Sequence, residues 1–361
     1  MENLKRLVKA LTNTHGISGM EQDVRDLIVS EIQSDCFALR EDVLGNLIAS
    51  VGAKGGYKIG VYAHMDEVGM IVRRISGRGM IHFDIVGSID ERIFIGSKVE
   101  IKTEGGKIIP GVIGNKSRHL QTSSDLSANV ALNQMAIDVG AQSANEVIEM
   151  GIEVGCPIMF DTKCHFYDNN TVLAKALDNR IGCTVLITAI NELNKKLENT
   201  TLYGIFTCQE EVGARGASVA GFGLDLDLCI TLDTVPVQNT EQVVEGEVNL
   251  GGGPVIRLLD WNAGTKLGMI TDKKISQRLR QVAQSAEIPH QIDVLSSTYL
   301  DSSTAHLTGS GIPGGSICFP RRYSHTAVEM SNMNDVESAV KLLCEFILSL
   351  DKAPIVFGKN Y

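Results

Sequence analysis

The sequence contains few aromatic residues, no closely spaced cysteine pair and no long apolar run. Aromatic residues make up 5% of the 361 residues and include a single tryptophan. Because carbohydrate sites usually stack sugar rings on aromatic side chains, this scarcity weighs against a sugar-binding enzyme. None of the eight cysteines belongs to a Cys-x-x-Cys pair. This pattern argues against a zinc knuckle or a disulfide framework and predicts reduced cysteines in the core.

Positive charge is also scarce. The chain has 33 Lys and Arg residues against 43 Asp and Glu residues, and its formal net charge is −10. Since phosphate binding needs clustered Lys and Arg, we expect no nucleic-acid partner. The first residues lack the apolar stretch of a signal peptide, and no apolar run is long enough to span a bilayer. We therefore expect a cytoplasmic protein without a membrane partner.

Predicted strands and helices alternate over most of the chain. Ser18 and Glu21 form the pattern of a capping box, which predicts a helix that begins there and ends near Ile32. Alternation of this kind is typical of an α/β fold with a mostly parallel sheet sandwiched by helices. The other predicted helices lie over 4–11, 181–193, 275–286 and 334–350, and the predicted strands over 45–51, 57–63, 201–208, 227–232 and 315–319.

The character of the sequence changes between residues 70 and 162. Short alternating or apolar runs are separated by glycines and turns, which is typical of a small β-rich module. One predicted helix, over 143–150, interrupts this region. We therefore predict a catalytic α/β domain formed by residues 1–69 and 163–361, with an inserted β-rich domain over residues 70–162.

Acidic residues and histidines follow most of the predicted strands directly. In open α/β sheets, ligands bind at the carboxyl ends of the strands, so we expect these side chains to converge at one edge of the sheet. Asp178 precedes a predicted helix and can join them. The strand-end residues are His64 and Asp66 after 57–63, Glu210 and Glu211 after 201–208, Asp233 after 227–232, and His325 after 315–319.

Carboxylates combined with imidazoles favour zinc, cobalt or manganese as the bound metal. In two-metal hydrolases the ions lie roughly 3.5–4 Å apart and clamp the reacting oxygens. Glu210 and Glu211 can divide the work, since one carboxylate can bind metal while its neighbour acts as a general base. Asp66 can hold His64 in its ligating tautomer. The predicted ligands of the metal pair are His64, Asp178, Glu211, Asp233 and His325.

The motifs resemble those of the dinuclear metallo-aminopeptidases of the glutamyl aminopeptidase type, the family of the tetrahedral aminopeptidases. Some members of this family carry the label endoglucanase. The resemblance extends over essentially the whole chain. Its most specific segments are Ala63–Gly69, Lys175–Arg180, Gln209–Gly213 and Arg322–His325.

The resemblance implies a role for each residue. One metal ion would be held by His64, Asp178 and Asp233. The other would be held by Asp178, Glu211 and His325, so that Asp178 bridges the pair. Glu210 would act as general base and acid, and Asp66 would orient His64. The resemblance also implies peptide substrates, two divalent metal ions per subunit, and dimers that assemble into a hollow tetrahedral dodecamer through the β-rich insertion.

The substrate pocket departs from the family pattern. Tyr299 and Leu300 precede Asp301 where the family usually has Gly-Thr, although Asp301 itself is kept. Arg321 directly precedes the segment Arg322–His325 and Arg322 is its first residue, and a guanidinium pairs well with a carboxylate. This favours an acidic residue at the substrate N-terminus, with a structural or solvent-facing role for the arginines as the alternative.

Three other functions are also compatible with these residues. A glycoside hydrolase could use Glu210 with Asp66 or Glu211 as its pair of carboxylates, although it would not need His64. A deacylase, carboxypeptidase or dipeptidase could use the same metal ions and base. A non-catalytic assembly protein would have kept the fold without the chemistry.

Overall fold

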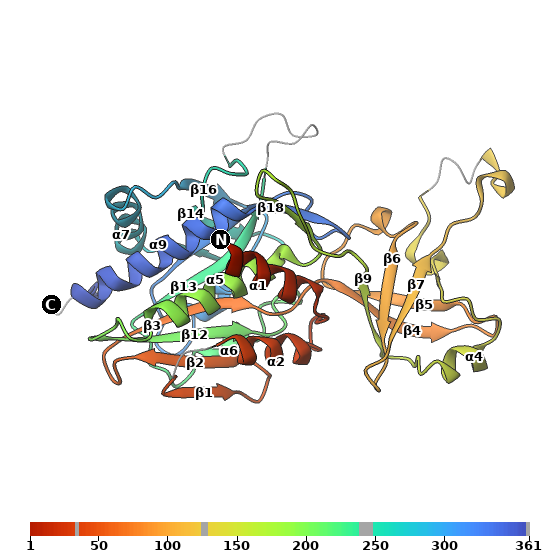
Figure 1. Ribbon diagram of the computed structural model, residues 1–361, viewed down its shortest axis with the longest axis horizontal. Helices are drawn as coiled ribbons and strands as arrows, with labels where there is room; N and C mark the ends of the chain where they lie inside the picture. The colour runs from red at the N-terminus through yellow and green to blue at the C-terminus, as the bar shows by residue number, and fades with distance from the viewer. Residues whose placement is uncertain (33–35, 124–128, 238–247, 359–361) are drawn as a thin grey trace.

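The computed structural model describes residues 1–32, 36–123, 129–237 and 248–358. It consists of a layered α/β part and a small closed barrel, which lies to the right in Figure 1. None of the helices in these ranges combines the length and the apolar character needed to cross a membrane. No disulfide links cysteines within the described residues, and Cys183, Cys208, Cys229 and Cys318 are buried.

The large sheet is mixed, with parallel strands at its centre. In spatial order its strands are β1 (Ala38–Glu41), β2 (Leu47–Gly52), β12 (Thr200–Thr207), β3 (Tyr57–His64), β13 (Leu228–Pro236), β17 (Gly314–Arg321), β14 (Val255–Asn262) and β15 (Leu267–Ile270), with β16 (Gln291–Leu295) paired to β14. Strands β12, β3, β13 and β17 run parallel. Their carboxyl ends therefore meet at one edge of the sheet.

Helices cover both faces of this sheet (Figure 1). One face packs against α1 (Glu2–Asn13), α2 (Gln22–Glu31), α5 (Leu177–Leu193), α7 (Lys273–Ser285) and α9 (Met333–Lys352). The other face packs against α6 (Ala217–Ala220) and α8 (Ser302–Ala305). Leu4, Leu7 and Leu11 of α1 are buried, as their helical spacing requires. Helix α5 is buried on nearly all sides because it lies between the sheet and helices α1 and α9.

The insertion folds as a closed antiparallel barrel with its own core. Three phenylalanines pack inside it: the rings of Phe83 and Phe94 meet edge to face with centroids 5.4 Å apart, and those of Phe94 and Phe160 stack with centroids 5.9 Å apart. The barrel order is β4 (Gly69–Ile75), β5 (Ile81–Val86), β8 (Ile137–Asp138), β7 (Ile108–Ile113), β6 (Lys98–Lys102) and β9 (Pro157–Phe160). The same region holds helix α4 (Ala144–Glu149) and the 3-10 turns η1 (Glu91–Ile93), η2 (Arg118–Leu120) and η3 (Leu132–Gln134).

A small separate sheet closes the layered part near the barrel. It is formed by β10 (His165–Phe166), β11 (Thr171–Ala174) and β18 (Glu329–Asn332) in that order. The architecture confirms the predicted fold class, a mostly parallel sheet between helices with an inserted β-rich unit. The residue boundaries proposed for the two domains stay a prediction.

Two local predictions were wrong. Ser18 and Glu21 do not form a capping box, because α2 begins at Gln22 without a side-chain cap. Ser18 instead donates to Oδ2 of Asp66 at 2.6 Å, and Glu21 accepts from the backbone N–H of Gln209 at 3.0 Å. Both side chains thus bind distant segments of the chain.

Strands β13 and β17 also continue past their predicted ends. Their parallel pairing extends to Pro236 and Arg321. Asp233 therefore lies within β13 and does not follow the strand as predicted, and Arg321 is the last residue of β17.

Candidate metal centre and active site

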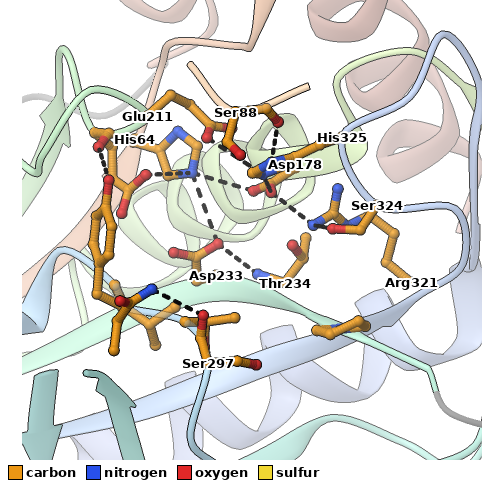
Figure 2. Close-up of a pocket in the computed structure, with 16 residues that line it drawn as sticks. His64, Ser88, Asp178, Glu211, Asp233, Thr234, Ser297, Arg321, Ser324 and His325 are labelled. Atoms are coloured by element: carbon orange, nitrogen blue, oxygen red, sulfur yellow. Dashed lines mark hydrogen bonds and ion pairs between the residues drawn. The ribbon is translucent and has the colours of Figure 1, made fainter. Parts of the chain in front are cut away.

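The carboxyl edge of the sheet carries a cavity of about 270 Å³ (Figure 2). His64 is the last residue of β3, and Asp233 lies near the end of β13. Glu210 and Glu211 follow β12, and His325 follows β17. Asp178 reaches the same place from the start of α5. These six side chains all line the cavity.

Asp178 lies at the centre of the cluster and faces two histidines. Its Oδ1 is 3.2 Å from Nε2 of His64, and its Oδ2 is 3.3 Å from Nε2 of His325. Nε2 of His64 is also 3.7 Å from Oδ1 of Asp233, and Nε2 of His325 is 3.3 Å from Oε2 of Glu211. One carboxylate thus connects two groups of side chains.

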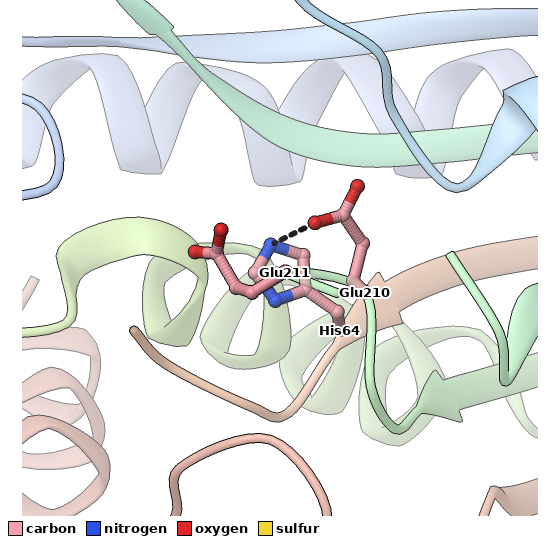
Figure 3. Close-up of side chains that lie close together, drawn as sticks. All are labelled: His64, Glu210 and Glu211. Carbon is pink, nitrogen blue, oxygen red and sulfur yellow. Dashed lines mark ion pairs between the residues drawn. The ribbon is translucent and has the colours of Figure 1, made fainter. Parts of the chain in front are cut away.

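Each of these groups has the composition of a metal site. Ligand atoms of His64, Asp178 and Asp233 all lie within 4.8 Å of one another, and so do those of Asp178, Glu211 and His325. Both groups are the sets that the resemblance implied. A third combination, His64 with Glu210 and Glu211, is equally close (Figure 3).

The ring nitrogen Nδ1 of both His64 and His325 lies near a hydrogen-bond acceptor. Nδ1 of His64 lies 3.2 Å from the backbone oxygen of Asp66 and 3.4 Å from its Oδ1. Nδ1 of His325 lies 2.9 Å from the backbone oxygen of Ser88, which follows β5 of the barrel. A proton on each Nδ1 would leave Nε2 free to bind a metal ion, which is the usual arrangement around ligating histidines.

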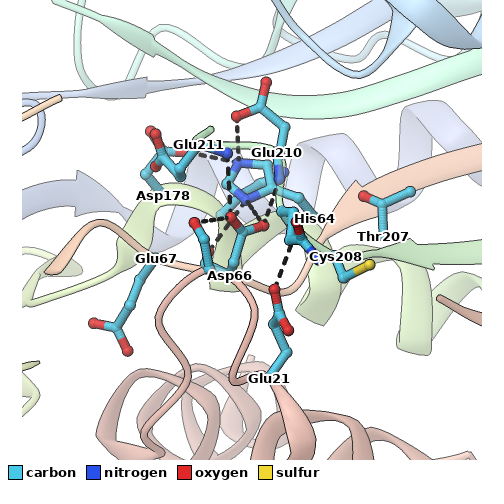
Figure 4. Close-up of polar contacts among 12 residues, drawn as sticks. Glu21, His64, Asp66, Glu67, Asp178, Thr207, Cys208, Glu210 and Glu211 are labelled. Carbon is cyan, nitrogen blue, oxygen red and sulfur yellow. Dashed lines mark hydrogen bonds and ion pairs between the residues drawn. The ribbon is translucent and has the colours of Figure 1, made fainter. Parts of the chain in front are cut away.

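Asp66 holds the loop that carries the two glutamates (Figure 4). Its Oδ1 accepts from the backbone N–H of Glu210 at 3.0 Å, and its Oδ2 accepts from that of Glu211 at 3.1 Å. Ser18 donates to the same carboxylate. Asp66 is fully buried, so its carboxylate depends on these protein partners and not on bulk water.

Burial and crowding of charge shift the pKa values of the cluster. Burial raises the pKa of Glu211 to about 8, and it raises that of Glu210 well above the ordinary value, with the charges of Asp233 and Glu211 adding to the effect. Burial alone would lower the pKa of His325, but the carboxylates of Glu211 and Asp178 raise it to about 9. Burial therefore favours the uncharged form of each of these groups, and the neighbouring carboxylates outweigh it only at His325.

The cluster fits divalent cations. Oε1 of Glu210 and Oε1 of Glu211 are buried and have no hydrogen-bond partner among the described residues. A buried carboxylate oxygen without a partner is costly. A cation between the two glutamates and the histidines would supply the missing partner, and carboxylates with imidazoles suit zinc, cobalt or manganese.

Of the three residues predicted to bind substrate, Arg321 lines the cavity and the other two do not. Asp301 is buried, is bonded by the Thr207 hydroxyl, and is not among the residues that line the cavity. Arg321 lines the cavity, but its guanidinium lies 2.7 Å from Oδ2 of Asp178 and is also bonded to Glu329. Arg322 is not among the lining residues.

The sequence did not indicate several residues at the site. Ser88 comes from the barrel, and Ser297 and Thr298 come from the segment after β16, whose alternating pattern was not recognised as a strand. Glu329 bonds Arg321 from β18. The one signal for Glu329 in the sequence is its position four residues after His325.

Comparison with known proteins gives consistent results. The family model described as M42 glutamyl aminopeptidase matches residues 45–342. The glutamyl aminopeptidase of Lactococcus lactis subsp. cremoris is 30% identical over 359 residues, which cover 98% of each chain. An aminopeptidase from the archaeon Desulfurococcus kamchatkensis is 34% identical with a TM-score of 0.90, over 96% of this chain and 94% of its own. The TET1 peptidase of Pyrococcus horikoshii, which can assemble into a tetrahedron or a large octahedral shell, is 31% identical with a TM-score of 0.84, over 95% and 98%.

Proposed function

This chain belongs to the M42 glutamyl aminopeptidase family, and on that premise we propose that it releases the N-terminal residue of peptides with two divalent metal ions. Its family and relatives make it an aminopeptidase, as the motifs predicted. The observation that carries the two-metal mechanism is the pair of ligand groups that share Asp178. A glycoside hydrolase would need no such pair.

The proposed ligands divide into two sets. His64, Asp178 and Asp233 would hold one ion, and Asp178, Glu211 and His325 would hold the other. Zinc or cobalt fits this donor set best, and manganese is the next choice. When bound, the ions supply Lewis acidity that polarises the scissile carbonyl and lowers the pKa of the attacking water.

Glu210 is the proposed general base. It lines the cavity, and its Oε1 has no partner among the described residues. As a carboxylate it can take a proton from water and return it to the leaving amine. Asp66 holds the backbone of Glu210 and faces His64, so we assign it the task of orienting both side chains.

The proposed assembly follows the TET1 relative. That peptidase can assemble into closed shells, and we propose that this chain also forms a homo-oligomer, a dimer that builds a tetrahedral dodecamer, with the barrel over residues 70–162 supplying contacts. Light scattering after gel filtration tests this assembly. A monomer at micromolar concentration would contradict it.

Activity is tested on aminoacyl chromogenic amides, each with a free and an N-acetylated amine. The protein is assayed as purified, in EDTA, and after zinc, cobalt or manganese is added back. We expect cleavage of the free-amine substrates alone, loss in EDTA and recovery with metal. Cleavage of the acetylated substrates would indicate a deacylase, and full activity in EDTA would contradict the metal mechanism.

A further inference from the structure

Glu329 accepts hydrogen bonds from the backbones of two residues that belong to one proposed metal site. Its side chain is buried at the start of β18, with a residue exposure of 2%. Oε2 accepts from the backbone N–H of Asp178 at 3.1 Å, and Oε1 accepts from the backbone N–H of His325 at 3.1 Å. One carboxylate thus fixes the positions of two residues that are far apart in the sequence and that are both proposed ligands of the same ion.

Arg321 completes this arrangement from β17. Its guanidinium bonds Oε1 of Glu329 and approaches Oδ2 of Asp178 to 2.7 Å, and it donates to Oγ of Ser324 at 2.7 Å. The planar fork of arginine can bind two carboxylates at once with fixed geometry. Since a carboxylate oxygen has two lone pairs, Oδ2 of Asp178 can accept from Arg321 and still face His325.

The local backbone needs such support. His325 has φ of 53° and Tyr323 has φ of 60°, both in the left-handed region that non-glycine residues seldom adopt. Such conformations persist where surrounding contacts hold them. The hydrogen bond from the N–H of His325 to Glu329 is one such contact, and it lies next to the imidazole that faces Asp178 and Glu211.

We propose that Glu329 and Arg321 are positioning residues that hold Asp178 and His325 in the geometry needed to bind a metal ion. This ion, called the second one below, is the one assigned to Asp178, Glu211 and His325. This inference rests on the proposed two-metal function. Glu329 acts on the two backbones, and Arg321 acts on the side-chain oxygen of Asp178 that faces His325. Neither residue needs to touch the substrate, so Arg321 serves the metal site and does not select acidic peptides.

The chain offers a matched control in Asp335. This carboxylate is 1% exposed and also accepts from two backbone N–H groups, those of Gly251 at 2.8 Å and Gly253 at 2.7 Å. Neither glycine is a proposed ligand or lines the cavity. Asp335→Asn therefore removes the same kind of buried clamp without changing the proposed site.

The test compares full-length wild type with Glu329→Gln, Arg321→Lys and Asp335→Asn. Each metal-free protein is titrated with Co²⁺ and followed by its visible absorption, with thermal unfolding recorded before metal is added. We expect Glu329→Gln to bind the second Co²⁺ roughly 10- to 100-fold more weakly than wild type, as removal of a group that orients ligands usually does. We expect a comparable fall in kcat with little change in KM, and normal Co²⁺ binding in Asp335→Asn.

Arg321→Lys keeps the charge but not the fork, so its second Co²⁺ should bind with intermediate affinity. It also carries the test if Glu329→Gln does not fold. Wild-type affinity for both ions in whichever of these two variants folds would overturn the inference, as would an equal loss in Asp335→Asn. Failure of wild type itself to bind two Co²⁺ ions would instead contradict the proposed function.

Discussion

Oδ1 of Asp66 accepts a 3.0 Å hydrogen bond from the backbone N–H of Glu210. The same oxygen lies 3.4 Å from Nδ1 of His64, so one carboxylate joins the end of β3 to the loop after β12. Its other oxygen bonds the N–H of Glu211. The imidazole, the proposed base and a proposed metal ligand therefore depend on a single side chain.

Asp66→Asn should lower kcat by roughly 10- to 100-fold. An amide has one acceptor oxygen, so one of the two backbone N–H groups, or Nδ1 of His64, would lose its partner. The measurement is kcat together with metal content by mass spectrometry. Asp351→Asn is the control, because this carboxylate also accepts from backbone N–H groups, those of Glu198 and Asn199. Unchanged kcat in Asp66→Asn would contradict the assigned role.

Glu210→Gln and Glu211→Gln should separate chemistry from metal binding. Loss of a general base lowers the rate by about 10²- to 10⁴-fold, so Glu210→Gln should lose activity while retaining two ions. Glu211→Gln should retain only one tightly bound ion. Metal content and kcat are measured on both. Because Glu210 also lies within 4.8 Å of His64 and Glu211, loss of an ion from Glu210→Gln would reassign it as a ligand.

The gain in stability on metal binding should be larger at pH 8 than at pH 6. In the metal-free protein the pKa of Glu211 is raised from 4.5 to about 8 by burial. The folded state therefore binds more protons than the unfolded state between these pH values, and stability falls as pH rises through this window. The pKa of His325, raised from 6.5 to about 9, acts in the same direction, since its contribution is lost as pH rises from 6.5 through about 9.

Divalent ions replace those protons, so their binding strengthens as pH rises. Thermal unfolding is measured in EDTA and with excess Zn²⁺ at both pH values. The shift in Tm that Zn²⁺ causes at each pH is the gain in stability. Glu211→Gln should show a weaker pH dependence. Shifts that are equal, or smaller at pH 8, would contradict the prediction.

Glu100→Gln should weaken the junction between the barrel and the layered part at neutral pH. Glu100 of β6 bonds Nε2 of His15 at 2.6 Å and Nζ of Lys163 at 2.6 Å. Burial alone would raise the pKa of Glu100, but these two partners lower it below 4.5. The contribution is therefore present above pH 4.5 and is lost as pH falls below that value.

We expect Glu100→Gln to cost roughly 0.2–1 kcal/mol of unfolding free energy at pH 7, as for partly exposed ion pairs, and to cost less near pH 4. Denaturant unfolding of both proteins at the two pH values measures the difference. An equal cost at pH 4 would mean that charge is not the cause.

Peptides with an N-terminal Glu should be cleaved no faster than those with an N-terminal Leu. The guanidinium of Arg321 is already paired with Asp178 and Glu329, and Arg322 does not line the cavity. Ratios of kcat/KM for Glu and Leu amides test this. A strong preference for Glu that disappears in Arg322→Ala would restore the acidic-substrate hypothesis.

The sequence predicted which polar residues gather at the carboxyl edge of the sheet, but it did not predict how far β13 and β17 continue. His64, Glu210 and Glu211 were found because an apolar run stops where the polar residues begin. The apolar run before Asp233 also stops, yet β13 continues, because its pairing with β17 runs on to Pro236. The pattern of apolar residues within a segment indicates which residues are buried. The length of a strand also depends on the strand with which it pairs, which can be far away in the chain.

The same limit explains Ser18 and Glu329. Ser18 has the local pattern of a helix cap, but its hydroxyl donates to Asp66, 48 residues away. Glu329 has no local pattern apart from its position four residues after His325, because its partners include the backbone of Asp178, 151 residues away. Such roles arise only from the folded chain.

The order of the proposed ligands along the chain has a consequence for biosynthesis. His64 precedes the barrel, Asp178 follows it, and His325 comes after β17, the strand that fits between β13 and β14. A ribosome-bound chain that has not yet reached β17 lacks both a strand of the large sheet and the last proposed ligand. On the proposed two-metal mechanism, peptide cleavage would therefore begin only when synthesis is almost complete.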